Sequence, residues 1–286
     1  MIVVTGATGS FGRQVIEHLL LRGVPAAQVV AAVRTPAKAA GLAALGVEVR
    51  TADYDQPETL SAAFAGADKV LLVSSTGSDA TRIAQHRAAI DAAAKSGVGV
   101  FAYTSVTRAP TNPMGLARVH RATEQAIVEA DLPAVVLRNG WYTENHTAAL
   151  PEAFARGTLT GSAGDGRIAS ATRADLAEAA AVVLTLDDQA GKTYDLTGDT
   201  TWTLPELAAE AAAQSGTPLA YTDLPAEQYR QILHHAGLPD PAVDLIVDAD
   251  VQISHGALAH LTSDLTTLLG RPATSLSATV AQTLRT

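Results

Sequence analysis

The sequence predicts an α/β fold: a doubly wound parallel sheet joined to a smaller, mainly helical C-terminal lobe. Residues 1–34 contain an apolar run, a glycine turn, a helix-patterned segment and a second apolar run. Apolar runs and helical segments then alternate as far as residue 142, after which glycines crowd together and helical patterns dominate. Such alternation is typical of parallel sheets. We therefore expect a Rossmann-like domain over residues 1–142, to which later segments return, and the lobe over residues 143–286.

The glycine turn has the residues that a dinucleotide site needs. The strand-like run Ile2-Val3-Val4 leads into Thr5-Gly6-Ala7-Thr8-Gly9-Ser10-Phe11-Gly12, and a helix pattern follows. Glycines so spaced allow a sharp turn, a close approach to a pyrophosphate and tight packing of the helix on the sheet. The helix N-terminus offers N–H groups and a positive dipole end to phosphates. We expect cofactor contacts from Gly6, Thr8, Gly9, Ser10, Phe11 and Gly12; the alternative is a tight turn without a ligand.

A basic residue follows the second expected strand, Val29–Val33. Arg34 follows it, Lys38 comes four residues later, and no Asp or Glu occurs between residues 24 and 46. NAD sites place an acidic residue here for the ribose 2′-hydroxyl, whereas NADP sites place Arg. A guanidinium can hold a 2′-phosphate in a fork, and a carboxylate would repel it. We therefore predict NADPH over NADH, bound through Arg34 and Lys38; the alternative is that both are solvated surface cations.

The following elements bring more polar residues to strand ends. We expect helices over residues 36–45, 57–66, 79–97 and 114–130, the second opened by a capping box at Asp55-Gln56-Pro57-Glu58. Strands are expected at residues 47–51, 69–73, 98–103 and 134–138, and a short one at 194–196. A second capping box, Thr203-Leu204-Pro205-Glu206, opens a helix of the lobe. Because ligands bind beyond the carboxyl ends of parallel strands, the cofactor crevice should also include Asp53, Tyr54, Ser74, Ser75, Thr76, Thr104, Ser105, Asn139, Gly140 and Trp141.

Composition excludes several classes of protein. Hydrophobic residues make up 47% and charged residues 17%, which indicates a globular chain. A net charge of −9 disfavours nucleic acid and acidic membranes as partners. The absence of Cys rules out disulfides, thiolate nucleophiles and Cys-bound metal clusters. No charged leader or long apolar run occurs, so we expect a soluble, cytoplasmic protein.

No metal site is expected either. His234, His235, His255 and His260 lack ligand spacing such as His-Glu-x-x-His, so we interpret them as surface residues. Ser105 lacks the Gly-x-Ser-x-Gly elbow of a nucleophilic serine. Neither a metal centre nor a nucleophilic serine is therefore expected.

Several segments together carry a family resemblance. They are the glycine turn, Val33-Arg34-Thr35-Pro36-Ala37-Lys38, Tyr103-Thr104-Ser105 and Arg138-Asn139-Gly140-Trp141-Tyr142-Thr143-Glu144-Asn145. With them the chain resembles NmrA-like members of the atypical short-chain dehydrogenase/reductase superfamily over essentially its whole length. It looks most like the bacterial NADPH-dependent quinone oxidoreductases of the QorB type. The resemblance implies a Rossmann-type domain, NADPH, a small C-terminal lobe and quinone reduction without flavin.

The chain departs from the wider superfamily at the catalytic pair. No Tyr has Lys four residues later, so the usual Tyr-x-x-x-Lys proton donor is missing. By the resemblance His120 stands where the catalytic Lys would be; it could orient the nicotinamide ribose, relay a proton, or simply pack. Tyr103 could border the substrate. Quinone reduction needs little more than contact between donor and acceptor, since water can protonate a phenolate whose pKa is about 10.

Aromatic and amide side chains are the substrate candidates. Trp141 and Tyr142 could stack on a quinone ring, although core aromatics would show the same pattern. Asn145 and Asn139 could hydrogen-bond a carbonyl or carboxamide, or cap a loop.

Three functions remain open at this point. The first is NADPH-dependent quinone reduction, the second a non-catalytic NADP(H)-sensing regulator of NmrA type, and the third reduction of another conjugated carbonyl. The physiological acceptor and the oligomeric state, including a homodimer, are not determined by the sequence.

Overall fold

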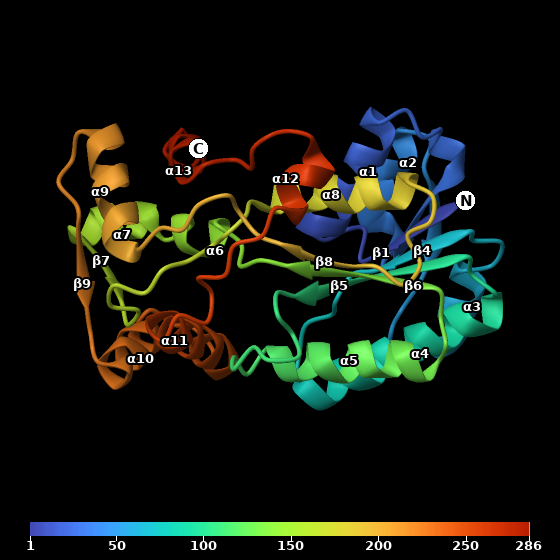
Figure 1. Ribbon diagram of the computed structural model, residues 1–286, viewed down its shortest axis with the longest axis horizontal. Helices are drawn as coiled ribbons and strands as arrows, with labels where there is room; N and C mark the ends of the chain where they lie inside the picture. The colour runs from blue at the N-terminus through green and yellow to red at the C-terminus, as the bar shows by residue number, and fades with distance from the viewer. Residues whose placement is uncertain (286) are drawn as a thin grey trace. The chain divides into compact units, whose positions relative to one another are not determined.

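The computed structural model describes residues 1–285 and divides into two compact units (Figure 1). Unit 1 comprises Met1–Pro110, Arg118–Asn139 and Arg173–Asp195. Unit 2 comprises Thr111–Ala117, Gly140–Thr172 and the chain from Leu196 onward. Each unit has a core of its own, and the chain passes between them several times. Among the described residues, no helix combines the length and hydropathy needed to cross a bilayer.

A parallel sheet forms the centre of unit 1. Its strand order is β3-β2-β1-β4-β5-β6-β8, so the direction of winding changes between β1 and β4. The strands are β1 (Ile2–Thr5), β2 (Val29–Val33), β3 (Glu48–Thr51), β4 (Lys69–Leu72), β5 (Val100–Val106), β6 (Ala134–Asn139) and β8 (Thr193–Leu196). The pairings from β3 through to β6 are all parallel. The predicted Rossmann-like, doubly wound fold is confirmed.

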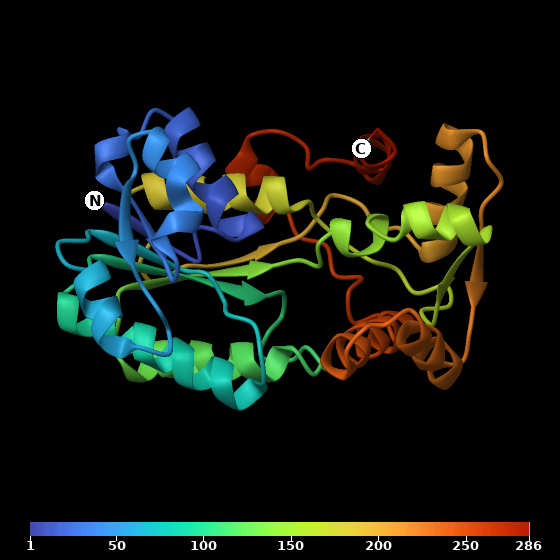
Figure 2. The same ribbon diagram turned by 180° about the vertical axis from the view of Figure 1, so that it is seen from behind.

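Helices cover both faces of this sheet (Figures 1 and 2). One group packs on the face that carries α1, where α8 lies directly against α1; the other group packs on the opposite face. The first group is α1 (Ser10–Leu21), α2 (Ala40–Ala44) and α8 (Arg173–Thr185); the second is α3 (Pro57–Ala63), α4 (Asp79–Ser96) and α5 (Ala117–Glu129). Strands covered on both faces are apolar along their length rather than alternating. Accordingly β2 is buried along its whole length.

Two local predictions were wrong. The capping box at residues 55–58 does not form, because α3 has Gln56 as its N-cap residue without a side-chain hydrogen bond. Asp55 instead accepts a hydrogen bond from the amide of Gln85 at 2.9 Å. Strand β5 also continues to Val106, beyond the end predicted at residue 103, because its pairing with β6 runs on to Asn139.

Unit 2 is mainly helical. Its helices are α6 (Glu144–Thr147), α7 (Leu150–Arg156), α9 (Leu204–Ser215), α10 (Ala226–His235), α11 (Asp240–Ser254), α12 (Asp264–Leu269) and α13 (Leu276–Thr283), beside a two-stranded parallel sheet of β7 (Thr158–Gly161) and β9 (Ala220–Asp223). The predicted capping box of α9 is confirmed, since Thr203 and Glu206 exchange side-chain and backbone hydrogen bonds. Leu150, Ile168 and Ile253 are fully buried in its core.

Candidate functional site

The glycine turn leaves the start of α1 open to a ligand. Gly6 has φ +59°, a conformation that favours glycine, and its carbonyl accepts the N–H of Gly9 at 2.9 Å. Gly9 is the N-cap residue of α1 and offers no side chain to the first helical N–H groups. A Cβ atom on Gly12 would lie 2.6 Å from the carbonyl oxygen of Gly6. The turn therefore depends on Gly12 and keeps the N–H groups available for phosphate oxygens.

A pocket of about 390 Å³ lies in unit 1 around this turn. It brings together predicted cofactor residues from the ends of several strands, and Arg34 and Lys38 are both exposed in it. The predicted members are Gly6, Thr8, Gly9, Arg34, Lys38, Asp53, Tyr54, Ser74, Ser75 and Thr76; the others are Thr35, Ala52, Asp55, Val73 and Gln85. Most of the additional residues are chain neighbours of predicted ones, whereas Gln85 comes from α4. The predicted residues that do not line this pocket are Ser10, Phe11, Gly12, Thr104, Ser105, Asn139, Gly140 and Trp141.

Tyr54 lines this pocket and is held by the buried Thr5 behind it. The Thr5 hydroxyl donates to the carbonyl of Leu71 at 3.0 Å and accepts the N–H of Val73 at 2.9 Å. The Tyr54 hydroxyl lies 2.6 Å from the Thr5 hydroxyl and 2.9 Å from the Val73 carbonyl. Burial raises the pKa of Tyr54, so the phenol remains protonated and can donate. These bonds fix the ends of β1 and β4, where the winding changes direction.

Buried polar side chains support Ser74 and Ser75 from behind. Arg82 donates to the Ser74 hydroxyl at 2.8 Å, and the Ser75 N–H donates to Nε2 of His86 at 3.0 Å. His86 Nε2 is therefore an acceptor, which places the ring proton on Nδ1, 2.8 Å from the Thr123 hydroxyl. Burial, followed by the charge of Arg82, lowers the pKa of His86 to about 3. The ring is neutral at physiological pH.

The two catalytic candidates form a buried pair. The Tyr103 hydroxyl lies 2.8 Å from Nδ1 of His120, joining β5 to α5. Burial raises the pKa of Tyr103 and lowers that of His120 to about 3. Tyr103 is 0% exposed and His120 5% exposed. Neither side chain lines the pocket of unit 1, so both lie in its core.

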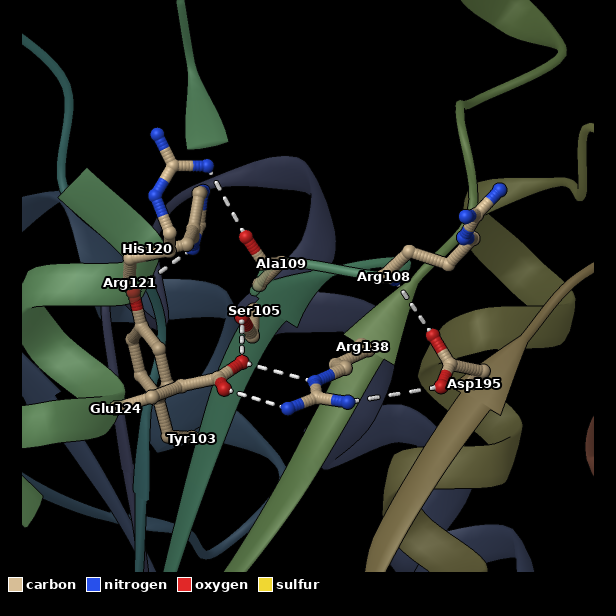
Figure 3. A network of polar contacts seen from close by, with 9 residues as sticks. All are labelled: Tyr103, Ser105, Arg108, Ala109, His120, Arg121, Glu124, Arg138 and Asp195. Atoms are coloured by element: carbon tan, nitrogen blue, oxygen red, sulfur yellow. Dashed lines mark hydrogen bonds and ion pairs between the residues drawn. The ribbon is translucent and has the colours of Figure 1, made fainter. Parts of the chain in front are cut away.

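Ser105 belongs to an ion-pair network that joins three strands and α5 (Figure 3). Its hydroxyl donates to Glu124 at 2.6 Å, and Arg138 donates to the two oxygens of Glu124 at 3.0 and 2.7 Å. Arg138 also lies 3.8 Å from Asp195, which accepts the N–H of Arg108 at 2.7 Å. Glu124 raises the pKa of Arg138 through these hydrogen bonds. The network therefore holds the predicted cofactor residue Ser105 within the structural frame of unit 1.

Unit 2 contains a separate cavity of about 360 Å³. Trp141 and Asn145, predicted to bind substrate, line it; Tyr142 does not. The indole N–H of Trp141 donates to Nε2 of His146 at 3.1 Å, and burial lowers the pKa of His146 to about 4. The apolar walls come from β7, α9, α10, α11 and residues that flank helices, and they include Ala149, Leu159, Leu204, Ile232, Leu233, Ala236, Leu238, Leu245, Ile246 and Ala249. Sequence reasoning missed all of these apolar residues, and it also missed Tyr229 and Asp250.

The remaining predicted residues lie outside both cavities. Asn139 ends β6 in unit 1 with only 5% exposure, and its Oδ1 has no hydrogen-bond partner among the described residues. Gly140 follows in unit 2, where a Cβ would lie 2.8 Å from the carbonyl of Leu196. Within residues 1–285, no three His, Asp or Glu side chains are grouped as metal ligands.

Relatives of known structure and activity match the whole chain. Quinone oxidoreductase 2 of Escherichia coli strain K12 is 46% identical over 281 residues, which are 98% of each sequence. The crystal structure of the E. coli NADPH-dependent quinone oxidoreductase QOR2 complexed with NADPH superimposes with a TM-score of 0.96 at 46% identity, covering 99% of this chain and 100% of that one. The Citrobacter sp. triphenylmethane reductase complexed with NADP(H) gives a TM-score of 0.95 at 39% identity, with coverage of 99% and 100%.

The family assignment rests on both kinds of comparison. The resemblance to bacterial NADPH-dependent quinone oxidoreductases, expected from the sequence, is confirmed by the full-length matches. Residues 6–187, which contain the glycine turn and most of unit 1, match the sequence profile of a family described as NAD(P)H-binding. The chain therefore belongs to the NAD(P)H-binding family.

Proposed function

We propose that the protein reduces quinones with NADPH and without flavin. The overall change is quinone + NADPH + H⁺ → hydroquinone + NADP⁺, in which a hydride carries two electrons to the quinone and water supplies the proton. The observation that carries this proposal is the pocket that combines the glycine turn with Arg34 and Lys38. The quinone oxidoreductase that is 46% identical supports the choice of acceptor.

The pocket of unit 1 is the proposed NADPH site. The open N-terminus of α1 faces the pyrophosphate, since Gly9 offers no capping side chain. Arg34 and Lys38 bind the 2′-phosphate, because both are exposed cations in the same pocket and no acidic residue stands at the end of β2. Bound NADPH supplies the hydride from its nicotinamide ring.

The cavity of unit 2 is the proposed acceptor site. Its volume, about 360 Å³, lies in the range of small-molecule sites. The hydrogen bond to His146 fixes the indole of Trp141, so its face offers a preformed surface for a flat ring. Apolar walls from several elements exclude water from a bound ring. Asn145, which also lines the cavity, is the proposed partner of an acceptor carbonyl.

Tyr103 and His120 are proposed to support the fold rather than to supply the proton. Both are buried, and their mutual hydrogen bond already joins β5 to α5. A hydroquinone oxygen has a pKa near that of a phenol, about 10, so water can protonate it without an acidic side chain. The loss of the superfamily's Tyr/Lys pair is then compatible with turnover.

The decisive experiment measures NADPH absorbance after addition of 1,4-benzoquinone to purified protein, with NADH in parallel. Denatured protein is also assayed for released flavin. We expect quinone-dependent oxidation of NADPH, much slower oxidation of NADH, and no flavin. Tight binding of NADPH without oxidation by any quinone would contradict the proposal and favour the sensing function instead. Released flavin in stoichiometric amount would overturn direct hydride transfer.

A further inference from the structure

Asp250 is a buried carboxyl group in an otherwise largely apolar cavity. It lies on α11, is 3% exposed, and lines the proposed acceptor cavity of unit 2. It follows Val243 and Val247, which are also buried, at helical spacing. The helix thus presents a carboxyl group at a position where its pattern calls for an apolar side chain. Burial of such a group is costly unless it is fully paired.

Only one oxygen of this carboxyl group accepts a hydrogen bond from the described residues. Oδ2 accepts the backbone N–H of Ser162 at 2.8 Å, whereas Oδ1 has no hydrogen-bond partner among the described residues. No ion pair within residues 1–285 includes Asp250, and the cation that lines the same cavity, Arg156, is paired with Glu152 at 3.1 Å. Because Asp250 lines the cavity and this oxygen is not among the fully buried atoms that lack a partner, a ligand in the cavity can donate to it.

The neighbouring strand makes room for the carboxylate. A Cβ atom on Gly161, the last residue of β7, would lie 2.9 Å from Oδ2 of Asp250. Any side chain there would push the carboxyl group out of place. Tyr229 also lines the cavity, and its hydroxyl makes no hydrogen bond with the described residues. This hydroxyl can therefore donate a hydrogen bond to a ligand, or accept one from it, without displacing a partner of Asp250. Asp250 and Tyr229 therefore both line a largely apolar cavity with hydrogen-bonding capacity left for a ligand.

We propose that Asp250 makes this cavity selective for aromatic acceptors that present an N–H or ammonium group, and against acceptors with an anionic substituent. The inference rests on the proposed function, because it assigns the specificity of the same acceptor site. An N–H group donates to Oδ1 and completes the hydrogen bonding of the carboxylate. An anionic group would be repelled in a medium where charges are poorly screened.

Three naphthoquinones of one ring size test this selectivity. They are 1,4-naphthoquinone, 2-amino-1,4-naphthoquinone and 1,4-naphthoquinone-2-sulfonate. Their dissociation constants are measured by quenching of tryptophan fluorescence without NADPH, and their KM values with NADPH. Comparing each acceptor between wild type and Asp250→Asn cancels differences in reduction potential. Asn keeps the shape of Asp and can still accept the Ser162 N–H through its amide oxygen.

In Asp250→Asn we expect binding of the amino compound to weaken and that of the sulfonate to strengthen. The ratio of their dissociation constants should change by about tenfold or more, while the unsubstituted quinone changes less than about twofold. The matched control is Asp240→Asn, which removes the same charge from an exposed residue at the start of the same helix, outside the cavity lining. It should leave the ratio unchanged.

The outcomes separate this inference from the proposed function. An unchanged ratio in Asp250→Asn, an equal change in Asp240→Asn, or weakened binding of all three acceptors would overturn the inference. Rapid turnover of the unsubstituted quinone would meanwhile leave the proposed function intact. If instead no acceptor oxidises NADPH while the binding ratio changes as expected, the proposed function fails and the selectivity of the cavity stands.

Discussion

The two cavities of this protein are built in opposite ways. The pocket of unit 1 consists of a glycine turn and short polar side chains at strand ends, and its only long charged chains are Arg34 and Lys38 among the described lining residues. The cavity of unit 2 is lined mainly by apolar side chains, most of them from helices, and also by Trp141 and Asp250. In the proposed function, backbone groups of the unit 1 pocket recognise what all nucleotides share, and side chains of the unit 2 cavity recognise what differs between acceptors. Substitutions should therefore affect cofactor and acceptor binding separately.

The largest effect on NADPH binding is expected for a substitution in the glycine turn, whose backbone forms part of the unit 1 pocket. In Gly12→Val the new side chain would begin 2.6 Å from the Gly6 carbonyl, which must move and distort the turn. NADPH binding, measured by nucleotide fluorescence, should fall below detection. Gly41→Val is the control, because a Cβ there meets nothing within 4 Å. Normal NADPH binding by Gly12→Val would contradict the close packing of α1 on the turn.

Asp250→Asn should reveal what the carboxylate costs in stability. Burial raises the pKa of Asp250 to about 6, with a further contribution from Asp223. The unfolded state releases the proton near the ordinary pKa of about 3.9. Wild-type stability should therefore fall as pH rises between these values. The other ionisable side chains that line the same cavity are His146, Glu152, Arg156 and Tyr229.

At pH 7.5 the asparagine variant should be more stable than wild type, by up to about 3 kcal/mol. The difference should become small near pH 4, where the carboxyl group is protonated in the folded state and about half protonated in the unfolded state. Urea unfolding between pH 4 and pH 8 measures it. A constant difference across this range would mean that Asp250 does not titrate as burial predicts.

Arg34→Ala tests the charged end of the unit 1 pocket. Losing a charge-assisted contact to the 2′-phosphate should weaken NADPH binding about 10- to 100-fold and leave NADH nearly unchanged. Titration with both nucleotides measures this. Arg87→Ala removes the same charge from an exposed residue of α4 outside the pocket and should have little effect. Equal losses for both nucleotides would contradict the 2′-phosphate assignment.

Trp141→Ala tests the aromatic wall of the unit 2 cavity. The KM for 1,4-benzoquinone should rise by about tenfold through loss of stacking and apolar contact, while the affinity for NADPH stays constant. Trp141→Phe retains a ring and should preserve most of the activity. A change in NADPH affinity would show that the two sites are not as independent as their construction suggests.

The smallest effect is expected for Tyr103→Phe. The variant loses the 2.8 Å hydrogen bond to His120 and should unfold about 1 kcal/mol more easily. Because both residues are buried, kcat should change less than about threefold. A fall in kcat with a displaced pH profile would instead give the pair a role in proton transfer.

The unit 1 pocket could largely be predicted because its residues are close in sequence to recognisable turns. The glycine spacing and Arg34 at the end of β2 follow rules that hold for parallel sheets in general. Ser105 was placed with the cofactor by the same rule, yet its hydroxyl is bound to Glu124. Strand order does not reveal which hydroxyl groups at a strand end are already engaged by side chains of a neighbouring helix.

The unit 2 cavity could be predicted only in part, since its wall combines helices far apart in the chain. Asp250 carried one local signal: it shares a helical stripe with Val243 and Val247. Arg82 and His86 carry the same signal on α4, being in phase with Ile90 and Ala93. Charged or polar residues at apolar phases of a helix therefore point to buried polar groups, although the phase alone does not identify their partners.

The late return of the chain to unit 1 has a consequence for biosynthesis. When residue 142 is added to the growing chain, α8 and β8 have not yet been made. Until β8 is made, β6 is an unpaired edge strand, and until α8 is made, α1 lacks the helix that packs on it. Lys69 likewise lacks its acceptors at this stage, because in the folded protein it donates to the carbonyls of Leu184 and Leu186 at 2.9 and 2.8 Å. A nascent chain stalled before residue 195 is therefore expected to expose an unpaired strand edge and apolar surface that promote aggregation, and to need chaperone protection.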